Sequence, residues 1–322
     1  MNGKIVTIFG GSGFIGRHLV RRLAAQGWRI RVAVRHPPQA GFLQPMGDVG
    51  QINAVPASVT NEASVAAAVR NATAVINLVG ILSEGGGATF QAIHADGAGR
   101  VARLARAAGA RSLIHVSALG ADAHSDSSYA RSKAAGELQV QDTFPEAVIL
   151  RPSVVFGPED DFFNRFSDLA GLSPVLPVFI GKGLSGEGPS FQPVYVGDVA
   201  DAIMTVLRDP AHQGKLFELG GPLRYSMRRI MEMVLHYTDR CRVILPVPLS
   251  LAVLPALVLQ NLPAPPLTRD QLRLLARDNV LKGAFSGFEA LGIVPTAAET
   301  ILPSYLRPSG PGTRMGIAPS KP

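Results

Sequence analysis

Tyr129 and Lys133 are the two residues whose types and spacing best suit catalysis. They stand four positions apart in the run Tyr-Ala-Arg-Ser-Lys, so on a helix their side chains would share one face. A free tyrosine has a pKa of about 10, and a neighbouring positive charge would lower that pKa towards the range useful for acid–base work. The pair therefore predicts proton transfer to or from a bound reactant, and the alternative is a solvated helix face.

A second group is a glycine-rich turn that contains Gly10, Gly13 and Gly16. It lies between an apolar run at residues 4–9 and a segment with helical spacing at residues 14–26. In that context one glycine makes a tight turn, a second lets the backbone approach a pyrophosphate, and a third lets the helix pack on the sheet. Phosphates then lie at the positive end of a helix. The context predicts a dinucleotide-binding loop rather than a purely structural turn.

The end of the predicted strand over residues 29–34 indicates which dinucleotide is bound. An Asp or Glu there would bond the ribose 2′-hydroxyl of NAD, whereas an arginine accommodates the 2′-phosphate of NADP. The chain has Arg35 at this point and no acidic residue, and Arg17 follows the third glycine. These arginines predict NADP(H). The alternative is a solvated Arg35 and a protein that does not discriminate.

Alternating strands and helices must position these residues. Strands are predicted at residues 4–9, 29–34, 51–55, 74–79, 113–117 and 147–150, with helices at 14–26, 62–69, 92–108 and 129–142. This order predicts an α/β fold, a Rossmann-like doubly wound parallel sheet.

The pattern loosens after Arg151, so the chain is divided into three parts. Residues 1–152 are expected to form the nucleotide-binding domain, to which some later segments can return. Residues 153–308 are expected to form a smaller C-terminal α/β lobe for docking or substrate, with helices at 199–208 and 226–237, and residues 309–322 an extended or disordered tail.

Composition limits the class of protein. The chain has 322 residues, of which 47% are hydrophobic and 17% charged, so it can bury a large core. Its net charge of +7 is spread out with no basic run, which predicts no nucleic-acid partner. An acidic partner or anionic lipid would fit this charge, and so would a merely solvated basic surface. The single Cys241 excludes an intramolecular disulfide and any cysteine-based metal site, and no metal is predicted.

The segment 244–262 is apolar but is interrupted by Pro246, Pro248 and Pro255. A membrane-spanning helix needs about 20 mostly apolar residues, so a packed or interfacial segment is favoured over a span. The stretch 261–267 is interpreted as a turn-rich linker. The start of the chain shows no signal or transit peptide, which predicts a bacterial cytosolic protein or one given in its mature form.

The order of motifs resembles the extended short-chain dehydrogenase/reductase superfamily over residues 4–222. The matching motifs are Gly10/Gly13/Gly16, Asn77-Leu-Val-Gly80, His115-Val-Ser117, Tyr129/Lys133, Leu150-Arg-Pro152, Pro193-Val-Tyr-Val-Gly-Asp198-Val-Ala and Phe217-Glu-Leu-Gly-Gly-Pro222. The loop and the resemblance together predict nucleotide contacts from Gly10, Gly11, Ser12, Gly13, Phe14, Ile15, Gly16, Arg17, Arg35, Ser58, Leu78, Val79, Gly80, Ser117, Tyr129, Lys133 and Pro152.

Three positions depart from that superfamily. Ser58 stands where the family has an Asp at the adenine, and His94 stands where it has an Asn. Leu119 takes the place of the catalytic Ser or Thr, and the loop from there to Tyr129 is short. Loss of a hydrogen-bond donor to the carbonyl would cost about 10²–10³ in rate, by analogy with an oxyanion donor. Catalysis by Tyr129 and Lys133 would then be vestigial, unless Ser117, Ser127 or Ser128 substitutes.

A closer resemblance accounts for these departures. The runs His115–Gly120, Ser127–Glu137, Phe144–Ala147 and Arg151–Phe166 are similar to an atypical branch, the NADPH-binding accessory subunits of respiratory complex I and their bacterial relatives. This resemblance implies a tightly held structural nucleotide. It also implies complex I subunits near the quinone site as partners and contact with the membrane surface. The implied location is peripheral, on the cytoplasmic side of a bacterial inner membrane, or on the matrix side if the protein is mitochondrial. The alternative is an active NADP-dependent reductase or epimerase.

Overall fold

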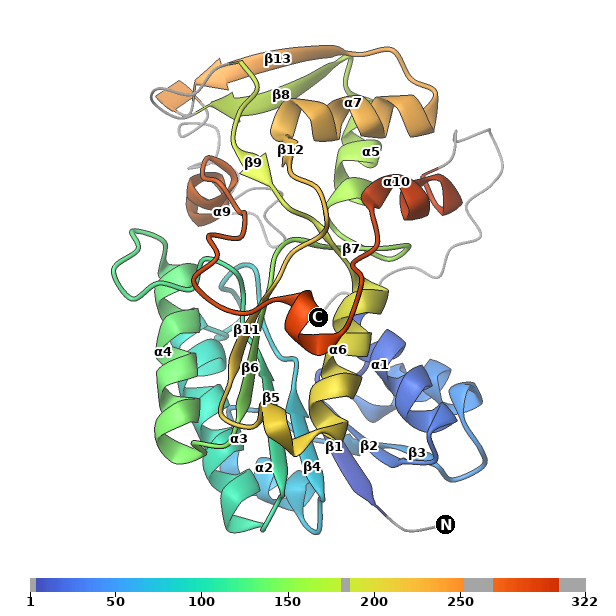
Figure 1. Cartoon of the computed structure of the whole chain (residues 1–322), viewed down its shortest axis with the longest axis vertical. Helices are drawn as coiled ribbons and strands as arrows, with labels where there is room; N and C mark the ends of the chain where they lie inside the picture. Colours follow the sequence, from blue (N-terminus) through green and yellow to red (C-terminus); the bar gives the residue numbers. More distant parts are fainter. Residues whose placement is uncertain (1–3, 181–185, 249, 252–268, 307–322) are drawn as a thin grey trace.

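Seven parallel strands form the central sheet, in the order β11-β6-β5-β4-β1-β2-β3 (Figure 1). The structure, a computed structural model, describes residues 4–180, 186–248, 250–251 and 269–306. The strands are β1 (Ile5–Phe9), β2 (Arg29–Val34), β3 (Ile52–Pro56), β4 (Ala74–Asn77), β5 (Ser112–Val116), β6 (Val148–Pro152) and β11 (Leu216–Leu219). The chain reverses its direction of winding between β1 and β4, which is where such sheets bind ligands. The predicted doubly wound parallel sheet is confirmed.

Helices cover both faces of the sheet because its strands are apolar on both sides. The helices are α1 (Phe14–Ala25), α2 (Glu62–Val69), α3 (Asp96–Ala107), α4 (Ser128–Thr143) and α6 (Val196–Arg208). One buried cluster joins α1 and α6 to the sheet, and a second joins α2, α3 and α4 to its other face. Gly27 and Gly109, both with positive φ, follow α1 and α3 and end them.

A smaller α/β lobe lies beyond the carboxyl edge of the sheet (Figure 1). Its elements are β7 (Val155–Phe156), α5 (Phe163–Leu172), β8 (Val175–Ile180), β9 (Ser190–Phe191), β10 (Val194–Tyr195), β12 (Tyr225–Ser226), α7 (Met227–Thr238), β13 (Val243–Pro248), α9 (Arg269–Leu275) and α10 (Ala298–Ile301). The strands pair as β7 with β10, β8 with β13, and β9 with β12. Phe156, Phe163, Leu176 and Met231 are among the buried residues of its core.

Residues 288–302 connect the seven-stranded sheet and its helices to the small lobe. Phe288 and Leu291 are buried in the cluster shared by α1, α6 and the sheet, while Ala298 and Leu302 belong to the core of the small lobe. Between them, Thr296 donates its backbone N–H and its hydroxyl to the carboxylate of Asp198 on α6, at 2.6 and 3.0 Å. Residues beyond 152 therefore contribute to both units.

Two predicted elements differ in detail. The helix predicted over 92–108 begins with a π-helical turn, Gln91–Ala95, before α3. The strand predicted over 74–79 ends at Asn77, because the Asn77 side chain accepts the Val79 N–H at 3.1 Å and turns the chain.

The apolar segment 244–262 is described only in part. Its beginning forms β13, which pairs with β8 although Pro246 and Pro248 lack an N–H. Ile244 packs on the core of the small lobe, as the packed alternative predicts. The rest of that segment, the linker at 261–267 and the tail at 309–322 lie outside the described residues. No helix in the described ranges is long and apolar enough to cross a membrane.

Candidate nucleotide-binding site

The glycine turn between β1 and α1 has a shape that only glycine permits. Gly10 has φ +77°, and a side chain on it would lie 3.2 Å from the Leu78 carbonyl carbon at the end of β4. A Cβ on Gly16 would lie 2.5 Å from the carbonyl of Gly11, so α1 packs directly on the turn. Gly13 is exposed and meets only the Gly10 oxygen within 4 Å. The turn is thus packed on its inner side and open at Gly13, the shape needed for a phosphate at the helix N-terminus.

The other residues of this loop support that geometry. Ser12 is half-buried within the turn. Ile15 packs against the core beneath the sheet, and the Phe14 ring lies edge-on to the His18 ring at 5.9 Å between centroids. The first turn of α1 is therefore fixed against the sheet.

The remaining predicted contacts lie where neighbouring strands end. Leu78, Val79 and Gly80 follow β4, Ser117 follows β5, and Pro152 ends β6. Because the carboxyl ends of parallel strands meet at one edge, these residues face the same side as the glycine turn. A Cβ on Gly80 would lie 3.4 Å from the Lys133 Nζ, so the loop after β4 reaches the predicted catalytic lysine.

Three polar atoms at this edge are buried without a hydrogen-bond partner among the described residues. They are the Arg17 Nε, the Ser117 Oγ and the His115 Nε2. Buried polar groups are normally paired, and Arg17 and Ser117 are both predicted nucleotide contacts. These atoms and the glycine turn fit a bound dinucleotide, which would supply hydrogen-bond partners here.

Two arginines lie near the glycine turn, one in the first turns of α1 and one just after β2. The Arg17 guanidinium lies over the Phe42 ring, 5.2 Å from its centroid, and 3.6 Å from a carboxylate oxygen of Glu159. Arg35 is exposed just after β2 and has no hydrogen bond or ion pair with any other described residue. Arg17 is therefore held in place, whereas Arg35 is free to meet a phosphate.

Ser58 follows β3 at the outer side of the sheet, and its hydroxyl is already engaged. The Ser58 Oγ lies 2.8 Å from the Thr60 Oγ1 and accepts the Thr60 N–H at 3.3 Å. A carboxylate in this position could accept two hydrogen bonds from a ligand, whereas this hydroxyl is occupied by its own turn.

Lys133 and Tyr129 converge on His94 rather than on each other. The Lys133 Nζ donates to the Val116 carbonyl at 3.3 Å. The Tyr129 ring stands edge-on to the rings of His94 and Phe90, at 5.2 and 5.8 Å between centroids. The Tyr129 hydroxyl has no hydrogen-bond partner within the described part of the chain.

Burial dominates the ionisation of this pair. It raises the pKa of Tyr129 to about 12, so the expectation that Lys133 lowers that pKa is wrong for the chain by itself. Burial also lowers the pKa of the Lys133 ammonium to about 8, against the opposing effect of the Glu137 carboxylate. The Lys133 Nζ, bonded to a backbone carbonyl, does not offset the effect of burial on the tyrosine pKa.

His94 takes a structural place at the π-helical turn. Its Nε2 accepts the Ile81 N–H at 2.9 Å, so the ring proton is on Nδ1, which lies 2.9 Å from the Ser132 Oγ. The Ser132 hydroxyl donates in turn to the Tyr129 carbonyl at 2.8 Å. Burial, followed by the Lys133 ammonium, lowers the pKa of His94 to about 3, so the ring is neutral. His94 therefore joins the loop after β4 to the helix that carries Tyr129.

No hydroxyl occupies the position of Leu119. The Leu119 N–H donates to the Pro152 carbonyl at 2.8 Å, which fixes the loop at the end of β6. Two of the three serines that could substitute for this hydroxyl are engaged elsewhere. The Ser127 Oγ donates to Asp270, and the Ser128 Oγ accepts from Arg131. Ser117 alone keeps a buried, unpartnered hydroxyl at this edge.

Several residues at the site were not predicted from the sequence. Glu159 lies against Arg17 and His18, Asp270 accepts hydrogen bonds from the start of α4, and Asn279 donates to the Leu119 carbonyl at 3.3 Å. Asp270 and Asn279 come from a segment about 140–160 residues away in the chain, and no local pattern marks them.

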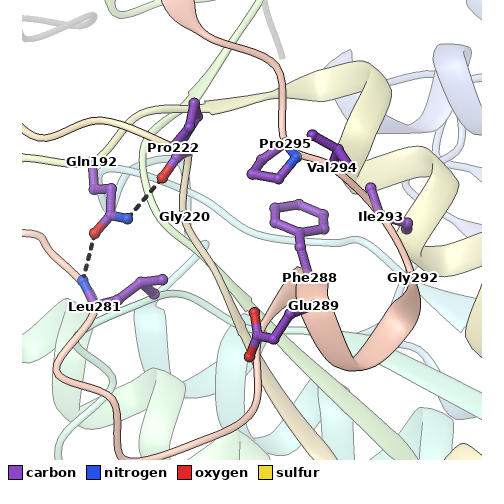
Figure 2. Close-up of a pocket in the computed structure, with 11 residues that line it drawn as sticks. Gln192, Gly220, Pro222, Leu281, Phe288, Glu289, Gly292, Ile293, Val294 and Pro295 are labelled. Carbon is purple, nitrogen blue, oxygen red and sulfur yellow. Dashed lines mark hydrogen bonds between the residues drawn. The ribbon is translucent and has the colours of Figure 1, made fainter.

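A cavity of about 600 Å³ lies elsewhere, beside the end of β11 (Figure 2). Phe288, Val294 and Pro295 line it together with Gln192, whose amide donates to the Gly221 carbonyl at 2.7 Å. None of the predicted nucleotide or catalytic residues lines this cavity. The glycine turn, not this cavity, carries the features of a dinucleotide site.

Comparison with known proteins agrees with the fold. Residues 6–220 match the NAD dependent epimerase/dehydratase family. The chain belongs to this family. The family implies a nicotinamide dinucleotide as cofactor. A solved structure with the same fold is that of the dTDP-glucose 4,6-dehydratase DesIV from Streptomyces venezuelae with NAD and TYD bound. The two structures match with a TM-score of 0.70 and 18% sequence identity, over 94% of this chain and 95% of that one.

Two curated relatives point to different roles. The chain is 33% identical over 302 residues to the mitochondrial NADH dehydrogenase (ubiquinone) 1 alpha subcomplex subunit 9 of Mus musculus, covering 93% of this chain and 78% of the relative. It is 35% identical over 206 residues to a ceramide reductase of Caulobacter vibrioides, covering 64% of this chain and 62% of the relative. The predicted resemblance to complex I accessory subunits is confirmed by the first.

Proposed function

We propose that this chain is an NADP(H)-binding accessory subunit of a respiratory complex I, in which the nucleotide is a structural cofactor. The observation that carries the proposal is the likeness to a named NADH dehydrogenase subunit over 93% of the chain. The site agrees with it, since the backbone turn that binds phosphate is intact while Leu119 supplies no catalytic hydroxyl. A ligand that binds only the folded state at 1,000 times its Kd stabilises that state by about 4 kcal/mol.

We propose NADP(H) rather than NAD(H) because of the charges at the end of β2. Arg35 is exposed and unpaired among the described residues, Arg17 is held beside the turn, and no carboxylate follows β2 to bond a ribose 2′-hydroxyl. A planar guanidinium suits a phosphate dianion.

The preference for NADP(H) is tested by Arg35→Ala. Loss of a charge-assisted hydrogen bond of about 1.5–3 kcal/mol should weaken NADPH binding about 10–100-fold and NADH binding much less. The matched control is Arg29→Ala, an exposed arginine at the opposite end of the same strand. Equal losses for both nucleotides in a fluorescence titration would refute the proposed phosphate contact.

The proposed partners are complex I subunits near the quinone site, with contact to the membrane surface on the cytoplasmic side of a bacterial inner membrane. The surface that suits such docking is the exposed apolar rim of the small lobe, where Leu172, Val243, Leu245 and Leu251 are at least 49% exposed. No nucleic-acid partner is proposed.

The second candidate is an active NADP-dependent reductase or epimerase. The relative named a ceramide reductase favours it, as do the retained Tyr129 and Lys133. Purification from native membranes separates the two proposals. Co-purification with complex I, with bound NADPH that no carbonyl compound oxidises, is the expected result, whereas turnover of a defined carbonyl by the free protein would establish the second candidate.

A further inference from the structure

Helix α9 holds the start of α4 through one carboxylate. The Asp270 Oδ2 accepts the Ser127 hydroxyl at 2.8 Å and the Tyr129 N–H at 3.1 Å, and its Oδ1 accepts the Ser128 N–H at 2.9 Å. The first N–H groups of a helix have no partner within the helix, and a negative charge is favoured beside them. Asp270 thus fixes the turn that carries Tyr129.

The next residue of α9 reaches the loop after β4. The Gln271 side chain donates to the Leu82 carbonyl at 3.1 Å. Leu82 lies two residues after Gly80, whose neighbour is the Lys133 Nζ. Two consecutive residues of α9 therefore connect the loop after β4 with the start of α4.

The C-terminal end of α9 and the residues after it are anchored in the small lobe. Leu275 packs on the core of that lobe, and Asp278 accepts the Ser190 N–H at 2.7 Å. Asn279 accepts the Ser153 hydroxyl at 2.6 Å and donates to the Leu119 carbonyl. Figure 1 shows α9 between the loop that leads into α4 and the small lobe.

We infer that residues 269–279, here called the strap, close the nicotinamide end of the site and slow the release of the nucleotide, with Asp270 as the main anchor. The inference rests on the proposed retention of NADP(H). The strap is attached to the loop after β4 at Leu82 and to the start of α4 at Tyr129, the two segments that lie beside Lys133, so a nucleotide held there would have to break these contacts to leave from that end. Differences in affinity between related complexes appear mostly in the rate of dissociation.

The experiment measures NADPH release from the full-length protein. The protein is loaded with NADPH, mixed with excess NADP⁺, and followed by the loss of NADPH fluorescence. Asp270→Asn removes the charge, and its amide nitrogen accepts no hydrogen bond, so release should be about 10–100-fold faster. Gln271→Ala removes the contact with Leu82 and should accelerate release about 3–10-fold. Asp142→Asn, at an exposed site in the last turn of α4, is the control and should not change the rate.

The two substitutions also separate a strap from a simple helix cap. If Asp270 only stabilised α4, Gln271→Ala would leave the rate unchanged, and that result would overturn the inference. The Ser127 Oγ also accepts the Ala130 N–H, a contact that none of these substitutions removes, so α4 should keep its own cap. Unchanged rates in a protein that does hold NADPH would refute the strap alone. A wild-type protein that binds no nucleotide would refute the proposed function and the strap with it.

Discussion

Two buried histidines, His94 and His115, should make the fold sensitive to acid. Both residues are only 1% exposed. Burial, and then the nearby Lys133 ammonium, lowers the pKa of both to about 3. Lys133 is itself offset by the Glu137 carboxylate on the same helix. In an unfolded chain the histidine pKa is about 6.5.

The sign and size of the effect follow from these values. Between about pH 6.5 and 3 the unfolded chain binds protons that the folded chain does not, so the free energy of unfolding falls as the pH falls. Consider a histidine whose pKa is about 3 in the folded chain and about 6.5 in the unfolded chain. At about pH 4.5 it lowers the free energy of unfolding by about 2.7 kcal/mol relative to neutral pH, and two such histidines lower it by about 5 kcal/mol. Whole domains are stable by only about 5–15 kcal/mol.

Urea unfolding of the nucleotide-free protein between about pH 7.5 and 4.5 measures this slope. In His94→Asn the amide oxygen can still accept the Ile81 N–H, but the side chain does not titrate, so the part of the slope that comes from the two histidines should fall to about half. His124→Asn, in an exposed loop, is the matched control and should keep the wild-type slope. Carboxylates such as Glu62 and Glu159, whose pKa values are lowered, titrate alike in all variants and cancel in the comparison. The same slope in His94→Asn and wild type would refute the reasoning.

Two further substitutions test the buried charges and the glycine turn. Arg151 forms a bidentate ion pair with Glu137 and a longer one with Glu218, all three nearly buried, so Arg151→Ala should lower the free energy of unfolding by about 3–5 kcal/mol. Arg103→Ala, which removes the exposed ion pair with Glu62 between α2 and α3, should cost much less in the same urea titration, and equal losses would contradict this ranking. Gly16→Ala places a Cβ 2.5 Å from the Gly11 carbonyl, which should weaken NADPH binding at least about ten-fold in a fluorescence titration. Unchanged affinity would show that this turn does not bind the nucleotide.

The parts of the fold that were predictable depend on local sequence. An apolar strand, a glycine turn and an amphipathic helix are encoded within about 25 residues, and β1, the turn and α1 were predicted to within one residue at each end. The order of the sheet follows from the alternation of strands and helices, because crossovers between parallel strands have a fixed hand.

The parts that were missed depend on contacts between distant residues. The π-helical turn before α3 buries His94 and lets it accept the Ile81 N–H, and nothing in the local periodicity of that helix records this contact. The same holds for Asp270, whose partners at the start of α4 are about 140 residues earlier. The direction of the Tyr129 pKa was mistaken for a similar reason, since the spacing placed Lys133 nearby but gave no measure of burial.

In the proposed site, the groups that would bind a nucleotide differ from those that would react with it. The proposed phosphate contacts depend mainly on backbone, namely the turn at Gly10–Gly16 and the strand ends after β4 and β5, and substitutions elsewhere leave this backbone in place. Turnover would depend on side chains. Leu119 supplies no hydroxyl, while Tyr129 and Lys133 are retained, the first with its pKa raised by burial to about 12 and the second bonded to the Val116 carbonyl. A chain that keeps the backbone contacts and loses a catalytic hydroxyl is expected to keep its affinity for a nucleotide better than its means of turnover. That combination is what the proposed structural nucleotide requires.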